Sequence, residues 1–222
     1  METRARMRVG GRQVPPELCG ELVAHDGPLT HAAISRTLES HGYVLLRGVL
    51  PVPLVEAAAT EVFAALQGED EVEPPPRQRV ITGRSNRKAN HPDLGDFWRG
   101  VCEGPALRRI SHGTELREVV SATMGEAARP FDLMYLRPTP PGEGTPPHAD
   151  FTFFATSRAD IDMLNAWVPY TPIALDEGPL MVIERTHAMP ELVTKLTEID
   201  YVSKETGGSL ADADRMTEIA YR

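Results

Sequence analysis

The pattern of apolar residues changes near residue 130, and this change constrains the fold more than any other feature. Before residue 125 the apolar residues recur with a helical period. After it come four short apolar runs, FDLMYLR, FTFFATS, MLNAWVPY and PLMVIER, separated by Pro, Gly and Asp clusters. Such runs are typical of strands in a sheet-rich core. Helices first and strands afterwards favour a mainly β sandwich or jelly roll with flanking α-helices.

A doubly wound α/β fold is disfavoured by the same order of elements. That fold needs strands and helices in regular alternation, with a glycine-rich first turn. Neither is present, and no glycine-rich stretch is followed by the Lys-Ser/Thr pair of a phosphate-binding loop.

Three helices are predicted before the change. Thr30 caps the first, over 30–41, which Gly42 ends, and a strand-like run, YVLLRGVL, follows. Pro51 and Pro53 open the second, over 54–67, and the third covers 114–124 with Thr114 as its cap. The resulting organisation is a lead-in over 1–29 and a single domain over 30–222. Its parts are a helical region at 30–125, a sheet core at 130–190 and a C-terminal part at 191–222.

The connection over 68–100 is predicted to be long and exposed. An acidic, proline-rich stretch, EDEVEPPP, is followed by RQRVITGRSNRK, which has no acidic residue. Its five basic residues are Arg77, Arg79, Arg84, Arg87 and Lys88. We expect a solvated, mobile loop, and the alternative is contact with an anionic substrate.

Overall charge and cysteine content narrow the class of protein. A formal charge of −9 gives no reason to expect a nucleic-acid or membrane partner. Cys19 and Cys102 lie far apart without CxxC spacing, which fits a reducing compartment. The sequence has no apolar leader segment and no apolar run of membrane-spanning length, so we expect a cytoplasmic protein. The sequence does not indicate its oligomeric state.

His148 and Asp150 are the candidate catalytic and metal-binding residues. They lie two apart before an aromatic, β-prone run, TPPHADFTFF. Residues i and i+2 of a strand project from one face, so an imidazole and a carboxylate would converge on one point. With a third ligand they would form the two-histidine, one-carboxylate triad that leaves positions on Fe(II) open. A second pair, His91 and Asp93, has a proline between its members and no strand pattern around it, which favours a turn.

The ordered motifs resemble the phytanoyl-CoA dioxygenase family of Fe(II)/2-oxoglutarate oxygenases. SHGYVLLRGVLP is similar to the family's opening strand. Further on, the family's His-x-Asp, Trp-x-Pro, Gly-Pro-Leu and Gly-Ser-His-like turn are matched in order by His148, Asp150, Trp167, Pro169, Gly178, Pro179, Leu180 and His187.

This resemblance implies a double-stranded β-helix, a cupin-like jelly roll. It also implies Fe(II) held by His148 and Asp150, with 2-oxoglutarate as co-substrate and Trp167 in its pocket. Plain core packing is the other interpretation of Trp167. The implied reaction consumes O2, converts 2-oxoglutarate to succinate and CO2, and hydroxylates a small molecule whose identity the sequence does not give.

The C-terminal part departs from the family pattern. The family's second histidine ligand and the arginine that anchors 2-oxoglutarate follow a late strand, and no histidine follows His187 here. His187 matches the earlier turn, so we expect a locally hydrogen-bonded turn residue rather than a ligand. A chain truncated before its last strands is the favoured explanation, and an inactive member or one with a substitute ligand is the other. The alternative functions are a non-catalytic jelly-roll binding protein and a metalloprotein that does not use 2-oxoglutarate.

Overall fold

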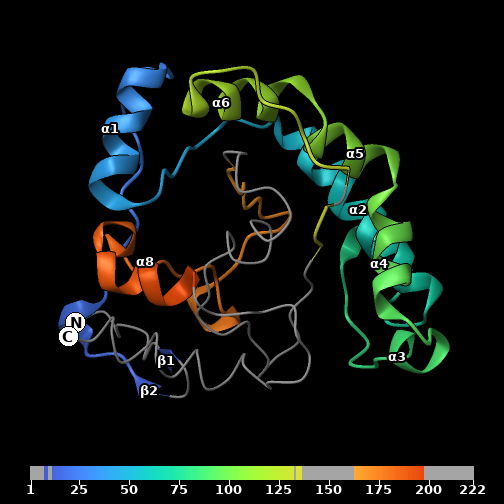
Figure 1. Ribbon diagram of the computed structural model, residues 1–222. Helices are drawn as coiled ribbons and strands as arrows, with labels where there is room; N and C mark the ends of the chain where they lie inside the picture. The colour runs from blue at the N-terminus through green and yellow to red at the C-terminus, as the bar shows by residue number, and fades with distance from the viewer. Residues whose placement is uncertain (1–7, 10–11, 133, 137–162, 198–222) are drawn as a thin grey trace. The chain divides into compact units, whose positions relative to one another are not determined.

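The computed structural model describes residues 8–9, 12–132, 134–136 and 163–197 (Figure 1). Its residues fall into two compact units. The first takes in the described residues of Met1–Arg47, Thr139–Ala166 and Ile173–Arg222. The second takes in those of Gly48–Pro138 and Trp167–Pro172. The C-terminal apolar runs are thus divided, since Trp167–Pro172 packs with the second unit and the residues after it with the first.

Helix α1 (His31–His41) organises the first unit, where the sequence predicted a helix. Ile34 is fully buried, and Gly42 ends the helix in the left-handed conformation with φ of 82°. Thr30 occupies the N-cap position, but its carbonyl rather than its side chain accepts the first hydrogen bonds, from Ala33 and Ile34. The predicted boundaries are therefore confirmed, while side-chain capping by Thr30 is wrong.

The run after α1 is extended without forming a continuous strand. It makes one parallel bridge, between Leu45 and Ala24, and the Leu45 carbonyl accepts a hydrogen bond from the His25 amide at 2.9 Å. The remaining first-unit elements are short: β1 (Arg8–Val9) paired antiparallel with β2 (Arg12–Gln13), and the 3-10 turns η1 (Pro16–Leu18), η4 (Leu175–Glu177) and η5 (Thr186–Ala188). Helix α8 (Pro190–Thr197) follows η5, and its Leu192 is buried.

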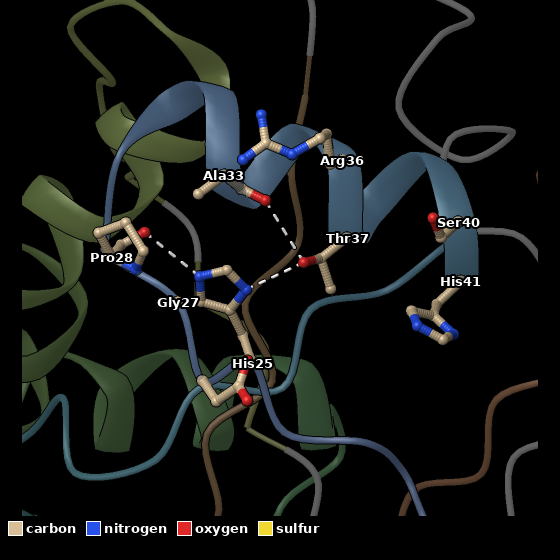
Figure 2. A pocket seen from close by; sticks show the side chains of 9 residues that line it. His25, Gly27, Pro28, Ala33, Arg36, Thr37, Ser40 and His41 are labelled. Atoms are coloured by element: carbon tan, nitrogen blue, oxygen red, sulfur yellow. Dashed lines mark hydrogen bonds between the residues drawn. The ribbon is translucent and has the colours of Figure 1, made fainter.

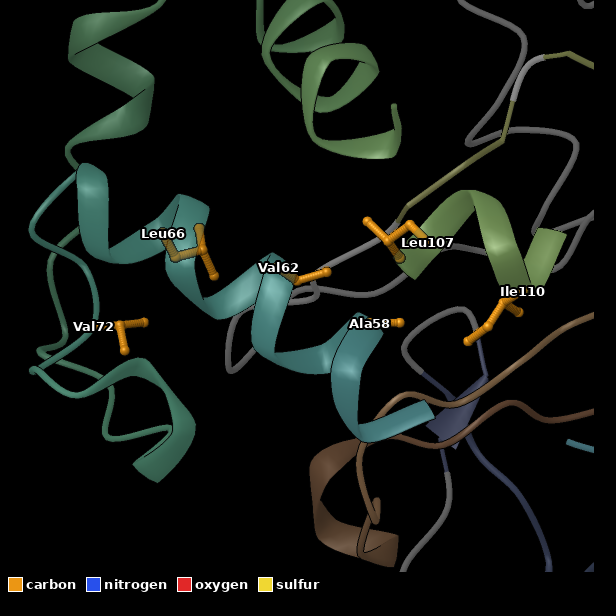
Figure 3. Close-up of a cluster of buried hydrophobic side chains, with 6 residues drawn as sticks. All are labelled: Ala58, Val62, Leu66, Val72, Leu107 and Ile110. Carbon is orange, nitrogen blue, oxygen red and sulfur yellow. The ribbon is translucent and has the colours of Figure 1, made fainter. Parts of the chain in front are cut away.

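Helix α2 (Val52–Gly68) is the centre of the second unit. Figure 3 shows the apolar face predicted from its sequence, where Ala58, Val62 and Leu66 are buried. They pack with Val72 and with Leu107 and Ile110 of α5 (Pro105–Ser111). The Glu61 carboxylate on α2 also accepts the first free amides of α5, from Ala106 at 3.1 Å and Leu107 at 2.9 Å. This polar contact joins the two helices beside their apolar one.

Most residues over 68–100 are exposed, as predicted, but the segment is not a connection without helices. The chain there forms the 3-10 turn η2 (Pro76–Gln78), α3 (Arg87–Asn90) and α4 (Leu94–Cys102). Phe97 and Trp98 at the centre of α4 stack edge to face, with ring centroids 4.8 Å apart. The sequence did not predict α4, because its single apolar turn lies between proline and polar residues.

Helix α6 (Thr114–Met124) closes the helical region, as predicted, and Gly125 ends it with φ of 79°. Gly113, not Thr114, takes the N-cap position, which corrects the predicted cap by one residue. Beyond α6 the described parts of FDLMYLR, MLNAWVPY and PLMVIER form no strand and no bridge with one another. A β-strand is recognised by its hydrogen bonds to a neighbouring strand. One predicted neighbour, the run FTFFATS, lies outside the described residues. The mainly β jelly roll therefore stays a prediction.

Candidate functional site

The two predicted metal ligands, His148 and Asp150, lie outside the described residues. Within the described part of the chain, no group of three or more His, Cys, Asp or Glu side chains could hold a metal ion. An imidazole nitrogen and a carboxylate oxygen are suitable ligands for Fe(II). The described residues that follow them in the family pattern are Trp167, Gly178–Leu180 and His187.

Trp167 is 52% exposed, whereas Val168 and Tyr170 close to it in the sequence are partly buried. Val168 and Tyr170 pack against the hydrophobic cluster around α2 and α5, so this segment is anchored on either side of Pro169. Burial raises the pKa of Tyr170 to about 12, and its hydroxyl lies 3.8 Å from the Met134 sulfur. The Trp167 side chain is thus about half exposed, and its role in a 2-oxoglutarate pocket stays a prediction.

His187 lies in η5, the Gly-Ser-His-like turn, and is held by α1. Its Nε2 donates to the Glu39 carbonyl oxygen at 2.9 Å, 148 residues away in sequence. The Arg185 amide donates to the His41 carbonyl at 3.0 Å, beside the same helix end. A β-carbon added to Gly42 would lie 2.5 Å from His187 Nδ1, so the imidazole packs directly on this glycine. The prediction of a turn residue is confirmed, but the partner is a distant helix rather than a local group.

Glu184 also contacts residues at and just after the end of α1. The Tyr43 hydroxyl donates to Glu184 Oε1 at 2.9 Å and accepts from the Val23 amide at the same distance. His41 Nδ1 lies 3.7 Å from the same Glu184 oxygen. Burial is the largest cause of the raised pKa of Tyr43, which keeps its hydroxyl protonated as a donor. We call Glu184, Arg185 and His187, with their partners on and after α1, the η5 anchor. No sequence pattern identified Glu184.

The second His-x-Asp pair has a structural role, as predicted. His91 Nε2 lies 2.8 Å from Glu69 Oε1, and the hydrogen bond from His91 is the main cause of the lowered pKa of Glu69. Asp93 is the N-cap of α4, where its Oδ1 accepts from the Gly95 amide at 2.7 Å and the Asp96 amide at 3.3 Å. The two side chains thus bind different partners and do not converge on a metal.

One charge of the basic segment is buried, although the prediction was a solvated loop throughout. Glu71 is 3% exposed and Arg87 is 8% exposed. The Arg87 guanidinium pairs with the Glu71 carboxylate, and the Arg87 amide donates to Glu71 Oε1 at 2.8 Å. The guanidinium also lies over the Trp98 ring, 5.4 Å from its centroid. One of the five cations is therefore a core component rather than a surface charge.

An open pocket of about 320 Å³ lies between the loop before α1 and the helix itself, and Figure 2 shows the residues that line it. His25 lies at its edge with both ring nitrogens engaged, by the Thr37 hydroxyl at 2.9 Å and the Pro28 carbonyl at 3.3 Å. Arg36 lines it from α1.

No described helix is long and apolar enough to cross a membrane.

Comparison with known proteins places the chain in a family. It is 25% identical to a 1-deoxypentalenic acid 11-beta-hydroxylase from Streptomyces arenae, over 75% of this chain and 58% of that protein. The chain thus spans under two thirds of that relative's length. No solved structure matches it. The model of the phytanoyl-CoA dioxygenase family matches residues 38–218, which is well over half of the chain and includes both His148 and Asp150. The chain therefore belongs to the phytanoyl-CoA dioxygenase family.

Proposed function

We propose that this protein is a non-haem Fe(II)- and 2-oxoglutarate-dependent dioxygenase that hydroxylates a small molecule. The observation that carries this proposal is the family match over 38–218, which spans the His148-x-Asp150 pair. The relative named as a hydroxylase supports the type of reaction, and its name describes a small acid as the molecule hydroxylated. A jelly-roll core formed from the runs after residue 130 would carry the site.

His148 and Asp150 would hold the iron, since one imidazole and one carboxylate are two members of a facial triad. When bound, the iron with 2-oxoglutarate and O2 would supply the oxidation of a C–H bond, with succinate and CO2 as the other products. The chain's own contribution is to bind and orient the reactants and to exclude bulk water. Trp167 would contribute an exposed aromatic face to the 2-oxoglutarate pocket.

His187 is not proposed as the third ligand. Its Nε2 is used by the Glu39 carbonyl, and its ring packs on Gly42, so coordination would require the η5 anchor to break. We propose instead that His187 fixes the end of the Gly-Pro-Leu segment on α1.

Succinate formation tests this proposal directly. The protein is incubated aerobically with Fe(II) and 2-oxoglutarate, and succinate is quantified with and without a panel of small acids. We expect slow succinate formation that Asp150→Ala abolishes. Asp93→Asn is the matched control, because Asn also caps helices well and Asp93 belongs to the other His-x-Asp pair. If iron binds normally and succinate never exceeds the Asp150→Ala level, the chain is a binding protein and the proposal is wrong.

A further inference from the structure

The pocket between α1 and the loop before it, which we call the α1 pocket, takes no part in the proposed function (Figure 2). All of its lining residues lie between positions 25 and 41, within the first unit. Its volume is about 320 Å³, at the lower end of ligand sites, which span roughly 300–1,000 Å³. The α1 pocket therefore has room for a small molecule, and its walls need no contribution from the second unit.

One face of α1 forms the first wall of the pocket. The lining positions 33, 36, 37, 40 and 41 recur every three or four residues, which places them on one side of the helix. All except Ala33 carry a hydrogen-bonding group: Arg36, Thr37, Ser40 and His41. This wall is therefore polar over about two turns of the helix.

The loop before α1 forms the second wall and is fixed to the first by hydrogen bonds. His25 Nδ1 lies 2.9 Å from Thr37 Oγ1, and His25 Nε2 donates to the Pro28 carbonyl at 3.3 Å. The His25 amide donates to the Leu45 carbonyl at 2.9 Å, and a β-carbon added to Gly27 would lie 3.1 Å from the His25 ring. The protein's own contacts thus hold both walls, which lowers the cost of ordering them around a ligand.

Two opposite charges line the α1 pocket without pairing with each other. Asp26 and Arg36 are both exposed, and the side chain of neither forms an ion pair or a hydrogen bond within the described part of the chain. His41, which could also carry a positive charge, already faces Glu184, with 3.7 Å between His41 Nδ1 and Glu184 Oε1. One carboxylate and one guanidinium are therefore available to a ligand in the same pocket.

A ligand with a single charge does not match this pair. An anion that pairs with Arg36 would meet the like charge of Asp26, and a cation that pairs with Asp26 would meet that of Arg36. A metal ion is also disfavoured, because no group of three or more His, Cys, Asp or Glu side chains in the described ranges could hold one. A molecule that carries both a carboxylate and an ammonium group pairs with both side chains.

We propose that the α1 pocket binds a small zwitterion with one carboxylate and one ammonium group, such as an amino acid. Arg36 binds the carboxylate, because the guanidinium fork matches two carboxylate oxygens. Ser40, one turn further along the same face of α1, donates its hydroxyl to the same group. Asp26 accepts hydrogen bonds from the ammonium group. The proposal goes beyond the proposed function, since it gives the α1 pocket no part in the oxidation.

Nuclear magnetic resonance titration of the full chain, without iron or 2-oxoglutarate, tests this proposal. The probes are glycine, β-alanine and 4-aminobutyrate, which differ in the separation of their two charges, and butyrate and butylamine are the singly charged controls. At least one zwitterion should bind with a Kd of about 1 mM and shift the amide signals of Gly27, Thr37 and Ser40. Butyrate and butylamine should bind about fivefold more weakly than that zwitterion, because each lacks one of the two pairings.

Substitutions in the pocket should act differently on the two kinds of probe. Arg36→Gln and Asp26→Asn should each weaken zwitterion binding about fivefold. Asp26→Asn should strengthen butyrate binding, and Arg36→Gln should strengthen butylamine binding, because each removes a like charge. Arg36→Lys keeps the charge and should retain more affinity for the zwitterion than Arg36→Gln. Both side chains are exposed, and thermal melts of each variant show that the fold is retained.

Arg117→Gln and Glu118→Gln are the matched controls, because both residues are exposed on α6 and the substitutions change net charge equally. Losses of zwitterion affinity in these variants equal to those in the pocket variants would overturn the proposal. So would zwitterion binding that is absent from the unaltered chain, no tighter than butyrate or butylamine binding, or accompanied by shifts only outside residues 25–41. None of these titrations involves iron, so failure here is separate from failure of succinate formation.

Discussion

At the scale of single residues, Gly42 explains how the end of α1 and the η5 turn come together. Its φ of 82° ends the helix, and its missing β-carbon leaves room for the His187 imidazole. Sequence reasoning found the first property, because glycine after a helical pattern predicts a C-cap. It could not find the second, because 145 residues of chain separate the two and no local pattern links them.

Gly42→Ala should destabilise the protein through both properties. A left-handed alanine costs about 1–2 kcal/mol, and the clash with His187 adds to that cost. Gly48→Ala is the matched control, because Gly48 has φ of 69° with nothing within 4 Å of an added β-carbon. In urea unfolding, the free energy of unfolding should fall more for Gly42→Ala than for Gly48→Ala. Adding His187→Ala to the Gly42→Ala variant should remove this difference. Equal losses at both glycines would show that His187 does not pack on Gly42.

The raised pKa of Tyr170 predicts that the second unit loses stability at high pH. Burial raises its pKa to about 12 from a usual value near 10, so the folded state favours the neutral phenol. This stabilisation is complete below pH 10 and is lost as the pH rises towards and through 12. Tyr170→Phe cannot ionise, so the stability of this variant should fall less between pH 10 and 12. Urea unfolding at several pH values measures this, and parallel decreases in both proteins would contradict the burial of the phenol.

At the scale of elements, the buried pair of Glu71 and Arg87 decides whether residues 68–104 form a loop or a packed helical segment. The pair joins the chain just after α2 to α3, and Arg87 contacts Trp98 of α4. Composition alone suggested a solvated loop, because prolines and charges dominate this stretch. Which one of many charges is buried depends on tertiary pairing, and single-sequence patterns carry no information on that.

Glu71→Gln should therefore be costly, whereas a change in an exposed pair should not. Removing one partner of a buried ion pair costs about 3–5 kcal/mol, because the other charge stays buried without compensation. Replacing Glu71 and Arg87 together with methionine should recover most of this loss. Asp96→Asn, in the exposed Asp96–Arg99 pair of α4, is the control and should change stability little. Urea midpoints compare the variants, and a small effect of Glu71→Gln would contradict the burial of the pair.

At the scale of the whole molecule, the sequence predicted the family and the three longer helices of the N-terminal half. Both follow from local or ordered signals: the apolar period of α2, the glycines after α1 and α6, and the motif order from His148 to His187. The short helices α3, α4 and α5 were missed, because each is held by partners from elsewhere, such as Glu61 for α5. The jelly roll and the iron ligands stay predictions, since FTFFATS, His148 and Asp150 lie outside the described part of the chain.

The central claim, that His148 and Asp150 hold Fe(II) together with 2-oxoglutarate, is tested most directly by visible absorption under anaerobic conditions. Adding Fe(II) and 2-oxoglutarate to the protein should produce a weak charge-transfer band. His148→Ala and Asp150→Ala should each abolish the band, while Asp93→Asn, in the structural His-x-Asp pair, should retain it. A band that persists in both the His148→Ala and Asp150→Ala variants, or that never forms in the unaltered protein, would contradict the claim.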